Sequence, residues 1–265
     1  MSVLDDVLDD LTAEGDQLES WVTPLSDEQW RTPTPAAGWD VATTIAHLAW
    51  TDEVVVVAAT DPAGWEQLIL EAMGDPEGFV DATAAAAATA PAADLLDRWR
   101  TARRRLPDVL RAHPEGEKVP WFGPPMSPAS MATARFMDTW AHGLDVADAR
   151  GVTAEPTDRI RHVAHLGVRT RDFAYATHSL EPPAEAFRVE LRAPSGETWT
   201  WGPDDAVQSV TGPAYDFCLL VTHRRHRDDL DLVATGADAD RWLDIAQAFA
   251  GPPGSGRPPT GEATS

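Results

Sequence analysis

Residues 131–150 read MATARFMDTWAHGLDVADAR and predict a long helix that faces a protein core. The apolar residues recur at spacings of three and four, which is the pattern of an amphipathic helix with one buried stripe. These residues are Ala132, Phe136, Trp140, Leu144 and Ala147. Gly151 follows directly and is a typical residue at the end of a helix. We therefore expect a core helix that ends near Gly151.

A carboxylate and an imidazole lie four residues apart on this helix, at Asp138 and His142. Residues at this spacing share one helix face, with Cβ atoms about 5–6 Å apart. The two side chains could hold one divalent ion, but catalytic zinc usually has three protein ligands and an open fourth position. The pair therefore predicts a metal site only if another part of the chain supplies a third ligand.

Three further segments show the same helical periodicity. They cover residues 3–22, a segment from Trp39 or Asp40 to about residue 60, and residues 92–112. Asp40 is a candidate N-cap for the second of them. Four long helices are typical of a four-helix bundle, in which sites are built in the core from side chains on facing helices.

His47 lies on the second of these helices and is the candidate for the third ligand. It is flanked by apolar residues, and Thr43 and Thr44 precede it by one turn. Spacing alone is compatible with two interpretations. His47 is either a hydrogen-bonded core residue or a ligand that faces Asp138 and His142 across the bundle.

The second half of the chain has a different pattern. Alternating apolar and polar residues predict strands, and helical segments lie between and beside them. We expect strands at 187–192, 197–201, 206–211 and 231–235, and helices at 157–179, from Pro213 onward, and at 238–249. The fold class is therefore α+β. We divide the chain into a helical bundle (1–153), a small α+β domain (154–250) and a disordered tail (251–265) that is rich in Pro, Gly and Ser.

Composition limits the possible partners and the location. The formal net charge is -22, which repels phosphate backbones and anionic lipid, so we expect neither nucleic acid nor a membrane as a partner. The acidic N-terminus does not resemble a secretory signal, and no stretch approaches the roughly 18 apolar residues of a membrane span. The single cysteine, Cys218, lies in an apolar segment and is expected to be buried. We expect a cytoplasmic protein that acts on a small molecule.

Several short fragments carry a resemblance to a known family. They are Gly38-Trp39-Asp40-Val41, Ile45-Ala46-His47-Leu48, Asp138-Thr139-Trp140-Ala141-His142-Gly143-Leu144-Asp145, Val210-Thr211-Gly212-Pro213-Ala214-Tyr215-Asp216-Phe217 and Val233-Ala234-Thr235-Gly236. In their order and spacing they resemble the mycothiol-dependent maleylpyruvate isomerase family. The resemblance implies a DinB-like, metal-binding four-helix bundle followed by a domain similar to sterol-carrier proteins.

The same resemblance implies a set of site residues. A divalent metal, usually zinc, would be held by His47, Asp138 and His142. The family typically has Glu where this chain has Asp138, so Asp138 is either a ligand or a residue just outside the metal's coordination. Asp145, three residues past His142, could orient the metal-bound imidazole, or it could be a surface acid near the helix end.

A basic residue of the second domain is thought to close over the site in this family, and Arg224 is the nearest match. The preceding residue is usually glycine in the family and is His223 here. Arg224 is therefore either a catalytic residue or a surface residue at a helix end.

The expected function is that of a metal-dependent S-transferase or isomerase that activates a mycothiol-like thiol for addition to a small electrophile. Two alternatives stay open. The metal could act without a thiol, in a lyase, cyclase or hydrolase, or the protein could be a non-catalytic small-molecule-binding module.

Overall fold

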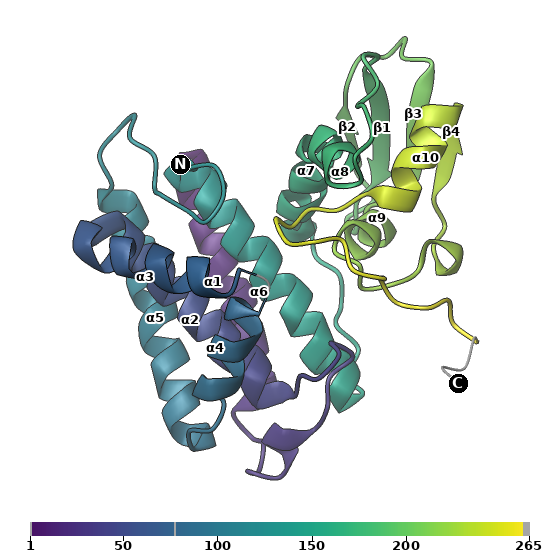
Figure 1. Cartoon of the computed structure of the whole chain (residues 1–265). Coiled ribbons are helices and arrows are strands. Elements are labelled where there is room, and N and C mark those ends of the chain that lie inside the picture. Colours follow the sequence, from purple (N-terminus) through teal and green to yellow (C-terminus); the bar gives the residue numbers. More distant parts are fainter. Residues whose placement is uncertain (1, 77, 262–265) are drawn as a thin grey trace. The chain divides into compact units, whose positions relative to one another are not determined.

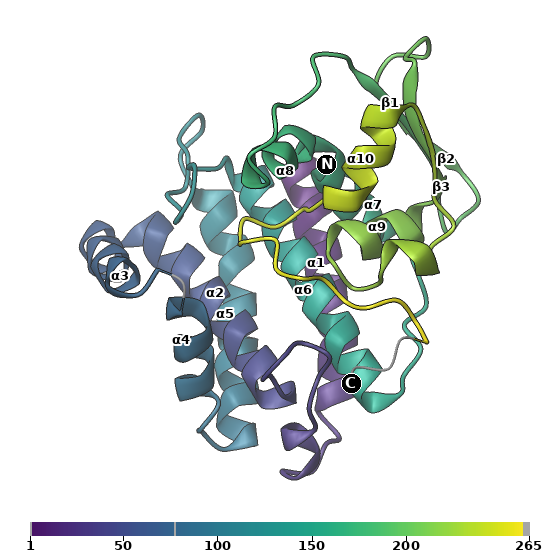
Figure 2. The ribbon, with the colours of Figure 1, turned by 45° about the vertical axis from the view of Figure 1, so that its right-hand side comes forward.

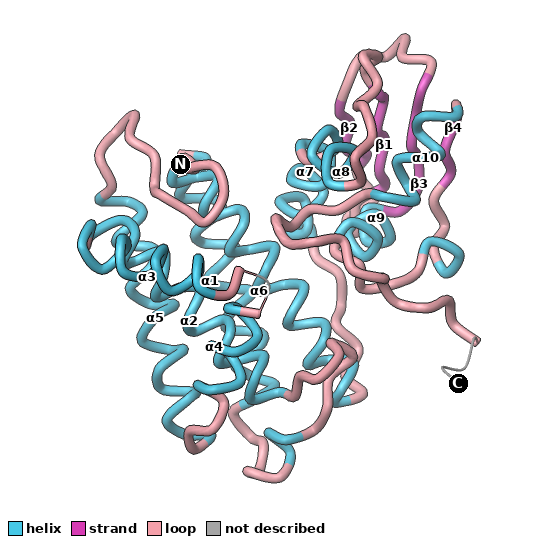
Figure 3. Tube along the Cα trace, in the orientation of Figure 1, coloured by secondary structure: helices cyan, strands magenta, loops and turns pink. Residues whose placement is uncertain are grey.

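The computed structural model describes residues 2–76 and 78–261 and divides the chain into two compact units, which meet between Ala154 and Glu155. The first unit is helical, and all strands of the described residues lie in the second unit (Figure 3). The predicted α+β fold class, with a helical bundle ahead of a small α+β part, is confirmed.

Four long helices form the first unit, and two shorter ones accompany them (Figure 1). They are α1 (Val3–Val22), α2 (Val41–Thr60), α3 (Pro62–Gly74), α4 (Phe79–Ala87), α5 (Ala92–Ala112) and α6 (Pro128–Arg150). Helix α1 lies along α6, α2 lies along α5, and α2 also contacts α6 (Figure 2). The apolar stripes read from the sequence therefore meet in one core, and α2 faces α6 as the site prediction requires.

Local sequence signals set the ends of α2 and α6. The Asp40 carboxylate accepts a hydrogen bond from the Thr43 backbone N–H at 2.7 Å, which confirms Asp40 as the N-cap of α2. Helix α6 begins at Pro128, three residues earlier than predicted, because Ser127 caps it and proline suits the first helical position. It ends at Arg150 and is capped by Gly151, whose φ of 62° lies in the left-handed region that glycine tolerates.

Helix α2 is more apolar than the sequence analysis allowed. By length and composition it could span a membrane, so the expectation that no segment approaches that limit is wrong. Of its most apolar 18-residue window, 89% is buried inside the protein. A fully buried helix in the centre of a bundle needs the same composition, because it meets apolar neighbours on every side.

The second unit combines short helices with one sheet. Its helices are α7 (Arg161–Arg169), α8 (Arg171–Thr177), α9 (Ala214–Val221) and α10 (Ala237–Ile245). The predicted helix 157–179 is interrupted, because Thr170 leaves the helical conformation and its hydroxyl donates to the Gln247 carbonyl at 2.6 Å. A tertiary hydrogen bond thus divides a segment whose local pattern is continuous.

Among the described residues, the sheet contains β1 (Phe187–Arg192), β2 (Thr198–Trp201), β3 (Gln208–Pro213) and β4 (Val233–Thr235) in the order β2-β1-β3-β4. Strand β1 is antiparallel to β2 and parallel to β3, and β3 is antiparallel to β4. Helix α9 contacts β1 and β3, and α10 contacts β3 and β4, so both helices cover the sheet.

Gly167 gives a testable packing prediction. A Cβ atom at this position would lie 2.9 Å from Val221 Cγ2 and 3.1 Å from Phe217 Cε1, and both of these side chains are fully buried. We expect Gly167→Val to lower the free energy of unfolding by about 1–3 kcal/mol, the usual cost of overpacking. Urea denaturation followed by circular dichroism measures this. The matched control is Gly74→Val, at a helical glycine with no neighbour within 4 Å, and an equal loss in both variants would contradict the prediction.

Residues 251–261 contain no helix or strand, but they make specific contacts within the second unit. The Arg257 guanidinium donates to the Arg224 carbonyl at 2.8 Å, and the Thr260 N–H donates to the Asp229 carboxylate at 2.9 Å. Residues 262–265 lie outside the described residues, and the disorder predicted for the tail stays a prediction.

Candidate metal centre

Helices α2 and α6 bring the three predicted ligands together. His47 Nε2 lies 3.3 Å from Asp138 Oδ2, and His142 Nε2 lies 3.5 Å from Asp138 Oδ1. One ligand atom from each residue lies within 4.8 Å of the others. Across the described residues, this is the one group of three or more His, Cys, Asp or Glu side chains with such spacing.

These separations suit a small divalent ion. Zinc bonds of 2.0–2.1 Å in a tetrahedral site place neighbouring ligand atoms about 3.3–3.5 Å apart. Each histidine lies at such a distance from one Asp138 oxygen, His47 from Oδ2 and His142 from Oδ1. With one ligand atom from each residue the separations reach 4.8 Å, so small side-chain movements would complete the site. Two imidazoles and a carboxylate are ligands that several first-row metals accept, so the ligand set fits a metal without choosing which one.

The electrostatic surroundings favour the protonation states that bind metal. Burial lowers the pKa of His47, so its ring is neutral near pH 7. Burial alone would raise the pKa of Asp138, but the Arg135 guanidinium and His47 outweigh it and hold that pKa well below its usual range. Metal ligands must be neutral imidazoles or ionised carboxylates. His47 and Asp138 are therefore in their binding forms at neutral pH.

The His142 ring is fixed from two sides. Its Nδ1 lies 3.2 Å from Asp145 Oδ2, and Trp39 stacks on its face with ring centres 5.4 Å apart and planes within 10°. Asp145 is 1% exposed, so the alternative of a surface acid is wrong. Contact with Nδ1 leaves Nε2 to face Asp138, which is the orientation a ligand needs.

Asp145 yields a prediction for metal affinity. We expect Asp145→Ala to weaken zinc binding about 10–100-fold, the usual effect of losing the carboxylate that orients a ligating histidine. Titration of the metal-free protein against a chromophoric chelator measures this affinity. Asp148→Ala, at an exposed acid one turn further along α6, is the control. Equal affinities in the two variants would contradict the assigned role.

Sequence reasoning missed two charged residues at this site. Arg135 precedes Asp138 by three residues, and its Nη1 donates to Asp138 Oδ2 at 2.5 Å. Arg135 Nε donates to Asp52 on α2 at 2.9 Å. The spacing of Arg135 and Asp138 was a readable signal, since residues three apart share a helix face. The sequence gives no local signal for Asp52, because its partner lies 83 residues away.

An aromatic cluster adjoins His47. Trp50 lies next to His47, with ring centres 6.4 Å apart, and Phe122 stacks on Trp50 at 6.3 Å. Phe79, Trp65 and Trp121 pack around Phe122. Two backbone hydrogen bonds between Val119 and Met126 form the loop that carries Phe122. This edge of the site is therefore aromatic and partly exposed.

Arg224 belongs to the second unit, just past the end of α9. Its guanidinium donates to the Thr222 carbonyl at 2.6 Å, and its side chain is half-buried. His223 has a φ of 57°, a left-handed conformation that glycine adopts at lower cost. Glycine, the residue expected at this position from the resemblance, would meet this backbone requirement with less strain. The catalytic role suggested for Arg224 stays a prediction.

Cys218 is 0% exposed on α9, as expected, and burial raises the pKa of its thiol well above the usual value. A buried, protonated thiol is a poor nucleophile. Any thiol chemistry of this protein would therefore need a thiol from another molecule.

Comparison with known proteins connects this geometry to a family. The family model described as the mycothiol maleylpyruvate isomerase N-terminal domain matches residues 11–147, and one described as wyosine base formation matches residues 183–235. Two uncharacterized proteins of Mycobacterium tuberculosis, from strains CDC 1551 / Oshkosh and ATCC 25618 / H37Rv, are each 58% identical over 248 residues, which is 94% of this chain and 96% of the relative.

Two solved structures share the fold. A crystal structure of the mycothiol-dependent maleylpyruvate isomerase aligns with a TM-score of 0.56 over 83% of this chain and 89% of that chain. A histidine-to-alanine mutant of the mycothiol-dependent maleylpyruvate isomerase aligns with a TM-score of 0.59 over 86% and 92%. Both are 15% identical to this chain, so this similarity establishes a common fold and not a common substrate.

Proposed function

Because this chain belongs to the mycothiol maleylpyruvate isomerase family, we propose that it is a divalent-metal-dependent enzyme that activates a low-molecular-weight thiol for addition to a small electrophile. The observation that carries this proposal is the convergence of His47, Asp138 and His142 within 4.8 Å. Three ligands of this kind leave a coordination position open, as catalytic sites require. Mycothiol is the first thiol to test, since the family takes its description from it.

Each residue of the site would have a separate role in metal binding. His47 and His142 would hold the ion through Nε2, and Asp138 would add a negative charge. The ion would supply positive charge that favours a thiolate over a thiol. Trp39 packs against both imidazoles, at 5.1 Å from His47 and 5.4 Å from His142. Its indole thus contacts both rings of the proposed site.

The reaction class follows from thiolate chemistry. Addition to a conjugated alkene forms a C–S bond and moves the π electrons onto the activating carbonyl. If the intermediate rotates about the former double bond and expels the thiolate, the C–S bond breaks and the net change is isomerisation. If the adduct takes up a proton and leaves, the net change is S-transfer. Because Cys218 is buried, the thiol in either case comes from a cosubstrate.

The experiment is metal analysis followed by a thiol-dependence assay on the full chain. We expect near one equivalent of a divalent metal by elemental mass spectrometry. We also expect turnover of maleylpyruvate or another conjugated electrophile only when mycothiol or a similar thiol is present. Turnover without thiol would favour a metal-dependent lyase, cyclase or hydrolase. A protein that stays metal-free after exposure to zinc, iron, nickel and manganese would contradict the proposal.

We also propose a cytoplasmic location. One unpaired, buried cysteine suits a reducing compartment. The charge of -22 favours small-molecule partners over nucleic acid or membrane surfaces. Fractionation of cells that express the tagged protein tests the location directly.

A further inference from the structure

Arg135 connects two carboxylates on different helices. Its Nε donates to Asp52 Oδ1 on α2 at 2.9 Å, and its Nη1 donates to Asp138 Oδ2 on its own helix at 2.5 Å. Asp52 lies five residues after His47 on α2. The guanidinium therefore links α2, the helix of His47, to Asp138, the acid of the candidate metal site.

The Arg135–Asp52 pair is deeply buried, since each residue is only 2% exposed. Burying two charges has a large desolvation cost, and well-packed apolar residues are often as stable in such a place. The third guanidinium nitrogen, Nη2, has no hydrogen-bond partner within the described parts of the chain, which adds a further cost. The stability of the bundle is therefore a poor explanation for this arrangement.

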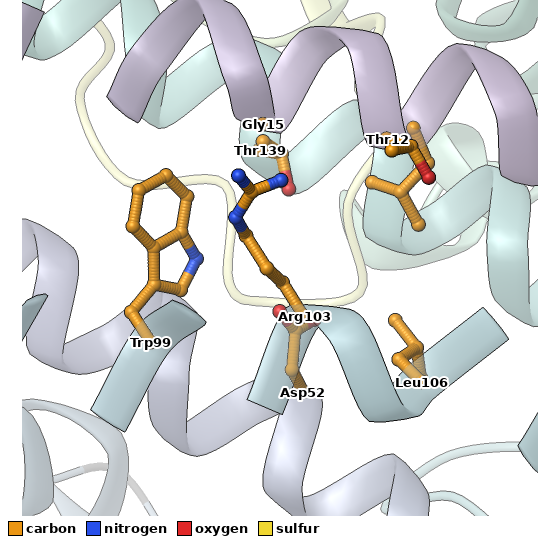
Figure 4. Close-up of a pocket in the computed structure, with 8 residues that line it drawn as sticks. Thr12, Gly15, Asp52, Trp99, Arg103, Leu106 and Thr139 are labelled. Atoms are coloured by element: carbon orange, nitrogen blue, oxygen red, sulfur yellow. The ribbon is translucent and has the colours of Figure 1, made fainter. Parts of the chain in front are cut away.

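Asp52 borders a cavity of about 10 Å³ inside the bundle, close to the size of one water molecule. Arg103 of α5 and Thr139 of α6 line the same cavity (Figure 4). The Arg103 guanidinium is paired with Asp16 and Glu19 of α1, so Arg135 is the arginine that binds Asp52.

The consequence for Asp138 is a fixed orientation. Its Oδ2 is shared between Arg135 Nη1 and His47 Nε2, and its Oδ1 faces His142 Nε2. The Asp138 side chain is 22% exposed. Without the hydrogen bond from Arg135, its carboxylate could rotate toward solvent. The planar guanidinium offers several donors in a rigid arrangement, so it can hold both acids at once.

We propose that Arg135, anchored by Asp52, is a positioning residue that sets the Asp138 carboxylate between His47 and His142 for metal binding. This inference rests on the proposed function, because it assumes that the three residues bind a metal. Arg135 makes no contact with the reacting molecules in this assignment. It acts through Asp138 alone.

The test uses the metal-free full chain and measures Zn²⁺ affinity by competition with a chromophoric chelator. The double variant Asp52→Leu/Arg135→Met removes one negative and one positive charge, so the net charge of the site is unchanged. It removes the hydrogen bonds that link Asp52, Arg135 and Asp138. We expect Zn²⁺ binding to weaken about 10–100-fold, as when other groups that orient a ligand are removed. Circular dichroism and thermal unfolding establish that the variant is folded.

A double-mutant cycle with Asp138→Ala separates positioning from general damage. If Arg135 acts through Asp138, adding the double exchange to Asp138→Ala should change affinity by no more than about twofold, within ordinary additivity error. A purely structural effect would weaken binding equally in both backgrounds and would overturn the inference. If the double variant does not fold, Arg135→Lys replaces it in the cycle, because lysine keeps the charge but not the planar donors. It should weaken Zn²⁺ binding in the wild-type background and change it little in the Asp138→Ala background.

Glu53 and Arg98 provide the matched control. Glu53 directly follows Asp52 on α2, and the Arg98 guanidinium of α5 donates to the Glu53 carboxylate in two hydrogen bonds of 2.8 and 2.6 Å. Glu53→Leu/Arg98→Met should leave Zn²⁺ affinity unchanged. A wild-type protein that binds no metal would contradict both the proposed function and this inference. If the wild type binds Zn²⁺ and the Asp52→Leu/Arg135→Met variant binds it with the same affinity, only this inference is contradicted.

Discussion

His142→Ala is expected to leave the bundle folded and to lower metal affinity by at least about 100-fold, more than the loss of a residue that only orients a ligand. His142 supplies one of three ligand atoms, and the remaining pair, His47 and Asp138, would hold an ion with two bonds. The side chain is 15% exposed and lies at the edge of the core, and thermal unfolding establishes that the variant is folded. Thiol-dependent turnover should fall in parallel. Elemental analysis and chelator competition measure the binding.

The control for His142→Ala is His165→Ala. His165 is an exposed histidine of α7 whose Nδ1 accepts a hydrogen bond from the Trp201 indole, and it belongs to no ligand group among the described residues. We expect this variant to keep its full metal content. Equal metal content in wild type, His142→Ala and His165→Ala would mean that the bound ion lies elsewhere, and the assignment of the centre would be wrong.

Arg135→Met is expected to lower the free energy of unfolding by about 3–5 kcal/mol, the usual cost of removing one partner of a buried ion pair. The variant leaves Asp52 buried without its partner, at a position that is 2% exposed. The cost is the desolvation of an unpaired carboxylate rather than the loss of one hydrogen bond. Urea denaturation followed by circular dichroism gives the free energy of unfolding.

Two comparisons test the cause of this loss. The double variant Asp52→Leu/Arg135→Met removes both charges and should recover most of the stability, because an apolar pair can replace a buried ion pair. Arg98→Met breaks the partly exposed Arg98–Glu53 pair and should cost no more than about 1 kcal/mol. If Arg135→Met lowers the free energy of unfolding no more than Arg98→Met does, the prediction that breaking the buried Asp52–Arg135 pair is strongly destabilising is wrong.

Much of the helical unit follows from the sequence because its signals are local. The periodicity of residues 3–22 and 92–112 matches α1 and α5, and Asp40 and Gly151 mark helix ends through their own side-chain and backbone chemistry. The four-residue spacing of Asp138 and His142 places them on one face of any helix. These features need no information from distant parts of the chain.

The local pattern was less informative in the second unit. It predicted the strand segments within about two residues, yet the parallel pairing of β1 with β3 depends on contacts far apart in sequence. A helical pattern that looks continuous is interrupted at Thr170, whose hydroxyl donates to the distant Gln247 carbonyl. Tertiary contacts override local propensity at such points.

The sequence by itself determined that an acid and a histidine share one face of a core helix, and that a buried-type helix carries His47. Whether His47 is a core residue or a ligand depended on the packing of α2 against α6, which brings its Nε2 to 3.3 Å from Asp138. The buried ion pair of Asp52 and Arg135 likewise forms only through the tertiary structure. Its two residues lie 83 positions apart, and burial alone turns their opposite charges into a specific pair.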